Sequence, residues 1–89
     1  MNPKVYEFEA VIKKVEDIDG AYVEFPYNVK EEFYKGRVKV KATFDGVNYD
    51  GSLVRMKTVQ HIIGIRKDIR KKIIKQAGDV IKVTIQERE

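Results

Sequence analysis

The sequence feature that most constrains the fold is the stretch from Lys35 to Val54, which is typical of a β-hairpin. Apolar and polar residues alternate on both sides of Asp45-Gly46, with the period of two of a strand that has one buried face. Asp-Gly favours a two-residue type I′ turn, because both central residues need positive φ. Pairing Phe44 with Val47 then gathers one apolar face. Its members are Val38, Val40, Ala42, Phe44, Val47, Tyr49 and Leu53.

Gly51 lies inside the second strand of this hairpin, opposite Val40. A glycine weakens a strand interior, so its presence there indicates a bend, a bulge or a close approach of the backbone to a neighbour. These features are common where a small sheet curls. The hairpin therefore predicts a curved sheet.

Alternation of apolar residues predicts four further strands, over residues 5–15, 21–25, 59–65 and 79–86. In the third of these, Val59, His61, Ile63 and Ile65 share one face and Ile62 lies on the other. Pro26 ends the second, because proline removes a hydrogen-bond donor from the ladder. With the hairpin, the chain has six predicted strands.

Two short helices are predicted between the strands. Asn28 and Glu31 have the spacing of a capping pair, so a helix is expected over residues 29–35, with Val29 and Phe33 buried and Gly36 as its left-handed terminator. The second helix is expected over residues 68–76 and ended by Gly78. Its apolar face would consist of Ile69, Ile73, Ile74 and Ala77, and the aliphatic part of Arg70 would lie along that face.

These elements predict a mainly β fold, a small closed or partly closed six-stranded barrel with two short helices at its ends. A split α+β sheet is the alternative. The 89 residues are expected to form a single domain, residues 1–89. The chain has no cysteine and no apolar stretch near the ~20 residues of a membrane span, and MNPKVYEFE lacks a signal-peptide pattern. A cytoplasmic protein without membrane association is therefore expected.

Positive charge is concentrated in one segment. Residues 55–75 contain eight basic side chains and one acidic side chain, whereas residues 1–54 contain eight and ten. Such asymmetry indicates an anionic partner, although a solvated helix face has the same pattern. The candidate contacts for an anion or a nucleic acid are Arg55, Lys57, Arg66, Lys67, Lys71, Lys72 and Lys75. Tyr22, Tyr27 or Tyr34 could stack on unpaired bases.

Motifs for catalysis, cofactors or metals are not assembled in this sequence. His61 is the only histidine, and the chain has no cysteine to complete a typical transition-metal site. Asp50, Ser52 and His61 are the residue types of a catalytic triad, but Ser52 lies on a predicted strand without the nucleophile-elbow motif. We therefore expect no catalytic, cofactor-binding or metal site.

Several short motifs are shared with a known family. They are Phe25-Pro26, Gly36-Arg37-Val38, Asp45-Gly46, Ser52-Leu53, the segment IRKDIRKKI of residues 65–73, and Gly78-Asp79-Val80. Through these motifs, which span nearly the whole chain, the sequence resembles the bacterial and archaeal family known as domain of unknown function nineteen-oh-five. The resemblance implies a small double-split β-barrel and no established activity. The chain differs from many relatives at Met56-Lys57-Thr58, where those relatives have a glycine-rich loop. It also lacks the bacteriocin-protection-type segment found in some relatives.

We therefore predict a non-enzymatic binding or interaction module with an unknown ligand and no cofactor. The alternative is a nucleic-acid-binding domain that uses the basic helix and neighbouring loops; the double-split barrel is similar in outline to dimeric, DNA-binding AbrB-like barrels, an analogy of fold only. A homodimer is also open, since a second copy could cover an exposed Ile62 or a strand edge.

Overall fold

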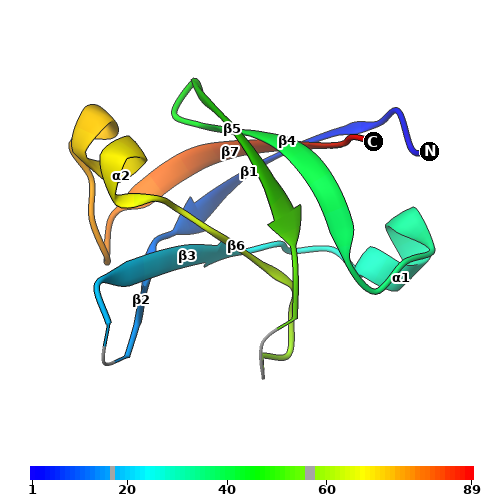
Figure 1. The fold of residues 1–89 in the computed structure, drawn as a ribbon, viewed down its shortest axis with the longest axis horizontal. Helices are drawn as coiled ribbons and strands as arrows, with labels where there is room; N and C mark the ends of the chain where they lie inside the picture. Colours follow the sequence, from blue (N-terminus) through cyan, green and yellow to red (C-terminus); the bar gives the residue numbers. More distant parts are fainter. Residues whose placement is uncertain (17, 56–57) are drawn as a thin grey trace.

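The computed structural model describes residues 1–16, 18–55 and 58–89, and contains the predicted hairpin (Figure 1). Strands β4 (Val38–Phe44) and β5 (Val47–Leu53) pair with Phe44 opposite Val47 and Val38 opposite Leu53. Asp45 has φ 48° and Gly46 has φ 87°, as a type I′ turn requires. The predicted register is confirmed over its whole length.

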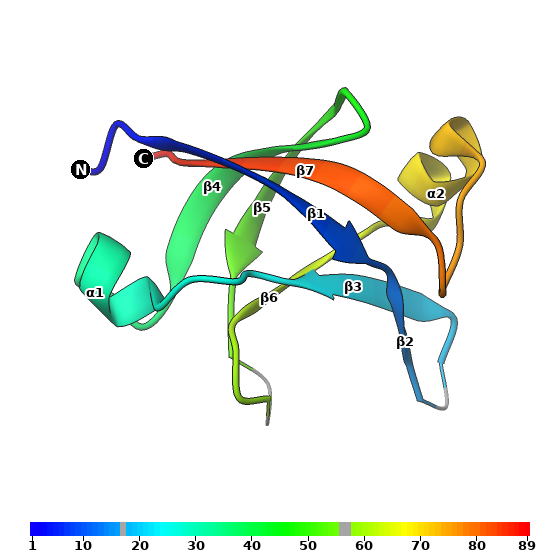
Figure 2. The ribbon, with the colours of Figure 1, turned by 180° about the vertical axis from the view of Figure 1, so that it is seen from behind.

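The strands form two antiparallel sheets (Figures 1 and 2). The larger sheet has the order β1-β7-β4-β5, with β1 at Val5–Val11 and β7 at Val80–Glu87. The smaller sheet has the order β2-β3-β6, with β2 at Lys13–Val15, β3 at Gly20–Glu24 and β6 at Ile62–Gly64. Helix α1 (Val29–Phe33) and helix α2 (Lys67–Ile73) lie at opposite ends of the molecule. The mainly β class with two short helices is confirmed.

The described residues form seven strands rather than the predicted six, because the first strand is divided at Ile12. The Ile12 N–H donates to the Asp79 carbonyl and the Ile12 carbonyl accepts from the Gly78 N–H. Beyond this point the chain leaves β7 and pairs with β3 instead. On the other side of the molecule a single bridge between Val54 and Ile62 joins the two sheets.

The interior is filled by the alternating side chains of both sheets. Phe25 and Phe44 are the largest fully buried side chains, and Phe25 meets Tyr6 edge-on with 5.4 Å between ring centroids. Gly51 lies under the Tyr49 ring, because a Cβ added at Gly51 would stand 2.5 Å from Tyr49 Cε2 and 3.2 Å from Ile63 Cδ1. Of the three explanations for this glycine, the close approach is confirmed.

Both helices are shorter than predicted, and each ends at a bulky residue in the left-handed region. Helix α1 ends at Phe33, and Tyr34 (φ 57°), not Gly36, has the left-handed conformation. Asn28 Oδ1 accepts from the Glu31 N–H as predicted. Helix α2 ends at Ile73, and Ile74 (φ 57°) follows it. The left-handed Gly78 comes four residues later, so the predicted continuation to Gln76 is wrong, and Ile74 and Ala77 are exposed rather than buried.

The strand predicted over residues 59–65 is reduced to β6. Val59 is exposed, whereas His61, Ile63 and Ile65 are buried as expected. Ile62 is also buried, because it pairs with Val54 and lies between β3 and the end of β5. Ile62 is therefore not exposed and offers no surface that a second copy could cover. A homodimer stays a prediction.

A polar cluster fastens the first residues of the chain to the end of β7. The Glu87 carboxylate is buried and accepts from the Lys35 ammonium (2.6 Å) and from the Asn2 N–H (2.7 Å). The hydrogen bond from Lys35 makes the largest contribution, and the bond from the Asn2 N–H the next largest, to holding the pKa of the Glu87 carboxyl below its ordinary value. The Tyr6 hydroxyl accepts from the Asn2 amide and donates to Glu32.

In the described residues, the model contains no helix that is long and apolar enough to cross a membrane. The cytoplasmic location stays a prediction.

Replacing Gly51 by alanine should destabilise the fold, because the new methyl group would collide with the Tyr49 ring and Ile63. Overpacking of this kind costs about 1–3 kcal/mol of unfolding free energy, measurable by urea denaturation. The matched control is Gly36→Ala, which meets no atom within 4 Å and should change stability by less than about 0.5 kcal/mol. Equal effects of the two substitutions would contradict the packing described for Gly51.

Candidate functional site

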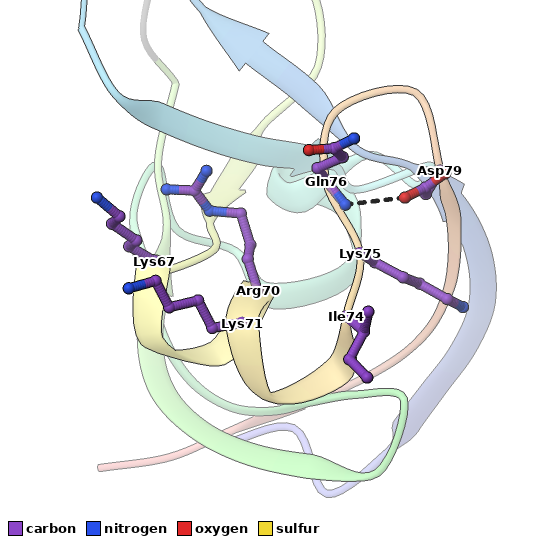
Figure 3. A pocket seen from close by; sticks show the side chains of 7 residues that line it. All are labelled: Lys67, Arg70, Lys71, Ile74, Lys75, Gln76 and Asp79. Atoms are coloured by element: carbon purple, nitrogen blue, oxygen red, sulfur yellow. Dashed lines mark hydrogen bonds between the residues drawn. The ribbon is translucent and has the colours of Figure 1, made fainter.

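The basic residues of α2 border a hollow of about 420 Å³ at one end of the molecule (Figure 3). We call it the α2 hollow. It lies along the helix and the loop that leads from α2 to β7. Its lining residues are Lys67, Arg70, Lys71, Ile74, Lys75, Gln76 and Asp79. The Gln76 N–H donates to Asp79 Oδ2 at 2.9 Å, which closes the loop at the rim (Figure 3).

Two cations of the hollow share one carboxylate. Asp19, in the turn between β2 and β3, lies 3.1 Å from Lys67 Nζ and 3.4 Å from Arg70 Nη1. The hydrogen bond from Lys67, with a smaller contribution from Arg70, lowers the pKa of the Asp19 carboxyl. Asp19 thus neutralises part of the positive charge that the sequence places on this helix.

Arg70 lies deeper than the lysines. Its side chain is 15% exposed, and its Nε is buried without a hydrogen-bond partner in the described structure. That its stem follows apolar surface stays a prediction, and the burial of Nε shows that the head does not extend fully into solvent. Sequence reasoning did not include Arg70 among the candidate contacts, although the structure places it in the hollow.

Lys75 has a structural contact that the sequence does not reveal. Its ammonium lies 2.6 Å from Asp45 Oδ2 and donates to the Val80 carbonyl at 2.8 Å. Asp45 Oδ1 accepts from the Lys82 N–H at 2.8 Å. The hydrogen bond from Lys75 lowers the pKa of the Asp45 carboxyl most, and the bond from the Lys82 N–H lowers it further. Lys75 therefore joins the end of α2 to the hairpin turn, and in Figure 3 it points away from Lys67 and Lys71.

The other candidate cations fall into two groups. Lys71 and Lys72 are exposed on α2, and Arg66 precedes the helix and pairs with Asp68 at 3.2 Å. Arg55 follows β5 and lies beside residues 26–30 at the start of α1, the helix at the opposite end of the molecule from α2. Lys57 lies outside the described residues. The structure therefore brings together the α2 cations and separates them from Arg55.

Ile74 is the apolar residue of the hollow. It is β-branched, has φ 57° and ψ 48°, and is 87% exposed. A β-branched residue is a genuine outlier in the left-handed region, where only glycine is unstrained. No local sequence signal indicated this conformation, because the isoleucine spacing predicted a continuing helix.

The exposed tyrosines do not lie beside the basic helix. Tyr27 and Tyr34 flank α1, at the opposite end of the molecule from α2. Tyr22 lies on β3, half-buried. Tyr27 and Tyr34, two of the three stacking candidates, are therefore not assembled with the lysines around α2.

No hydrogen bond in the described part of the chain joins the side chains of Asp50, Ser52 and His61, the residue types of a triad. His61 Nε2 donates to the Gly36 carbonyl at 2.7 Å, so this nitrogen does not serve Ser52, which lies on β5. Within the described ranges, no group of three His, Cys, Asp or Glu side chains could hold a metal ion.

A family model described as "Domain of unknown function (DUF1905)" matches residues 8–85. The chain belongs to this family. The suspected resemblance is thereby confirmed, and the match includes the β4–β5 hairpin and the whole α2 hollow. The DUF1905 description names no activity, and no curated protein matches the chain.

Substituting Asp45→Asn removes the charge that binds Lys75 while keeping a favourable turn residue, since Asn-Gly also suits a type I′ turn. We expect a loss of about 1 kcal/mol in unfolding free energy at neutral pH. The folded state lowers the pKa of Asp45, so the carboxylate contributes its full stabilisation at pH values above the pKa of the unfolded state, near 3.9. This contribution is lost as the pH falls through the pKa of the folded state.

Urea denaturation of both proteins from pH 7 to pH 2.5 tests this expectation. The difference in stability should be constant down to about pH 5 and vanish at the acid end. A difference that persists unchanged at pH 2.5 would contradict an ionic role for Asp45.

Proposed function

We propose that this DUF1905 chain is a non-enzymatic binding module whose α2 hollow docks a protein segment rich in acidic and apolar side chains. The observation that carries the proposal is Ile74, an apolar side chain presented to solvent from a strained backbone and surrounded by cations. Apolar anchors with a charged rim are the usual composition of a protein-binding surface.

The conformation of Ile74 destabilises the folded chain, and burial of the Ile74 side chain does not compensate for this cost. A left-handed L-residue is less stable than glycine by roughly 1–2 kcal/mol, and Ile74 buries little of its side chain. Backbone strain of this kind often occurs at binding sites, where it fixes the direction of a side chain. A partner that covers Ile74 would recover the apolar burial that the folded chain leaves unused.

The charges around Ile74 favour an acidic partner. Lys71 and Lys72 are exposed, and Lys67 shares Asp19 with Arg70. An incoming carboxylate could contact Lys71 directly and accept a second hydrogen bond from the Lys67 ammonium, which has three donors. Such contacts should speed association and weaken with salt.

The nucleic-acid alternative has less support. It requires phosphate contacts from Lys71, Lys72 and Lys75, and the last of these is engaged by Asp45 and Val80. Two of the three tyrosines that could stack on unpaired bases, Tyr27 and Tyr34, lie at the other end of the molecule. Nucleic-acid binding is therefore treated as a contrary outcome of the experiment below.

Replacing Ile74 by glycine should stabilise the fold and weaken binding at the same time. Removing the left-handed strain is expected to add about 1 kcal/mol, which raises Tm by roughly 4–8 °C in a domain of this size. Removing the anchor should lower the affinity for a docked peptide about tenfold. Thermal unfolding and fluorescence anisotropy measure the two effects.

Peptides for this measurement come from phage-display selection on the immobilised protein, with mixed-sequence DNA and RNA titrated in parallel at low and moderate salt. Selected peptides should combine Asp or Glu with Leu, Ile or Phe. Ile74→Ala is the matched control, because it removes the anchor and leaves a left-handed non-glycine residue. It should lose binding as the glycine variant does, without the gain in Tm.

The proposal fails if no acidic–apolar peptides are enriched, or if the Ile74 variants bind them as well as the parent does. It also fails if nucleic acid binds tightly at low salt with steep salt dependence while such peptides do not.

A further inference from the structure

A second hollow, of about 300 Å³, lies beside the start of α1, between residues 26–30 on one side and Arg55 with residues 59–61 on the other. We call it the His61 hollow. Its side chains include Tyr27, Lys30, Arg55, Gln60 and His61. The volume is at the lower end of the range for small-molecule sites. None of the observations that support the α2 hollow involves these residues.

His61 is fixed in one orientation at the wall of this hollow. The residue is 8% exposed, and its Nε2 lies 2.7 Å from the Gly36 carbonyl oxygen. A carbonyl oxygen only accepts, so Nε2 carries the hydrogen and Nδ1 of the neutral ring is an acceptor. Among residues 1–16, 18–55 and 58–89 no hydrogen bond to Nδ1 is formed. A ligand N–H or O–H could therefore donate to it.

The charge of the His61 hollow is positive. Arg55 and Lys30 line it, and none of the described lining residues is acidic. The α2 hollow, in contrast, contains Asp79, and its cations contact Asp19 and Asp45. The Arg55 Nε donates to the Thr58 carbonyl at 2.9 Å. This bond holds the guanidinium through Nε, and no hydrogen bond within the described residues engages its two terminal nitrogens, which could bind a carboxylate or a phosphate.

Tyr27 provides a flat apolar surface beside these cations. Its ring is supported by Phe25, with 5.5 Å between centroids in a T-shaped contact, and by Tyr6 at 5.6 Å. The side chain is nevertheless 46% exposed. A ring that two aromatic neighbours hold in place and that is still nearly half exposed is suited to stacking against a planar ligand.

We propose that the His61 hollow binds a small organic anion that contains a flat ring. Arg55 and Lys30 take the anionic group, the Tyr27 ring stacks on the flat ring, and His61 Nδ1 accepts a hydrogen bond from a ligand N–H or O–H. The inference is independent of the proposed protein partner, because the two hollows share no lining residue, one lying along α2 and the other beside α1.

His61 is the only histidine in the chain, so its ring signals in proton NMR report on this hollow without ambiguity. The probes are adenosine monophosphate, nicotinate and salicylate, added at constant pH. Their neutral counterparts are adenosine, nicotinamide and salicylamide. We expect at least one anion to shift the His61 signals saturably, and its neutral counterpart to bind about tenfold more weakly.

Arg55→Gln should weaken binding of that anion about tenfold while leaving the spectrum of the folded protein intact, because Arg55 is exposed. Lys72→Gln removes an equal charge from α2 and should leave the affinity unchanged. The proposal is overturned if none of the three anions shifts the His61 signals. It is also overturned if inorganic phosphate shifts them as strongly as the ring-containing anions, or if the two variants lose affinity equally.

Discussion

The carboxylate of Asp45 is the interaction on which the arrangement of this domain depends. It lies in the turn that fixes the β4–β5 register, accepts from the backbone of β7 through Lys82, and pairs with Lys75 after α2. The hairpin turn thus meets β7 and the loop that precedes it, 30 to 37 positions later in the sequence, at one side chain. The turn sets the hairpin register, the hairpin places its apolar stripe inward, and the same residue holds the loop that shapes the α2 hollow.

The features that support a function lie where local stability is not optimal. Ile74 and Tyr34 have left-handed conformations that glycine would adopt without strain, and both are exposed. Arg70 buries an Nε that has no hydrogen-bond partner among the described residues. The interior, in contrast, is regularly packed. A rigid β framework that carries strained, exposed residues at its ends is consistent with a module that binds through its ends.

The sequence predicted the parts of the fold that local chemistry decides. The hairpin register follows from Asp-Gly and a period of two, and the Asn28 cap follows from its spacing to Glu31. The helix ends were mispredicted, because glycine was taken as the terminator while the tertiary structure imposed the left-handed conformation on Tyr34 and Ile74. The division of the first strand at Ile12 depends on hydrogen bonds to residues 78 and 79, which no local pattern reveals.

The candidate site was predicted only in part, because tertiary contacts that no local pattern reveals decide which of its cations are paired. Lys67, Lys71 and Lys72 were found from charge density along the helix, but the carboxylates that neutralise Lys67 and Lys75 come from turns 30 to 48 positions away in the sequence. Only the folded chain shows which of the cations are already occupied.

The bond between the Asn2 N–H and the buried Glu87 carboxylate brings residues 2 and 87 together at one corner of the molecule. A short peptide could span that corner, so this unit could be grafted into a surface loop of a host protein, entering and leaving at adjacent points. Such a graft would carry both hollows without breaking a strand of either sheet.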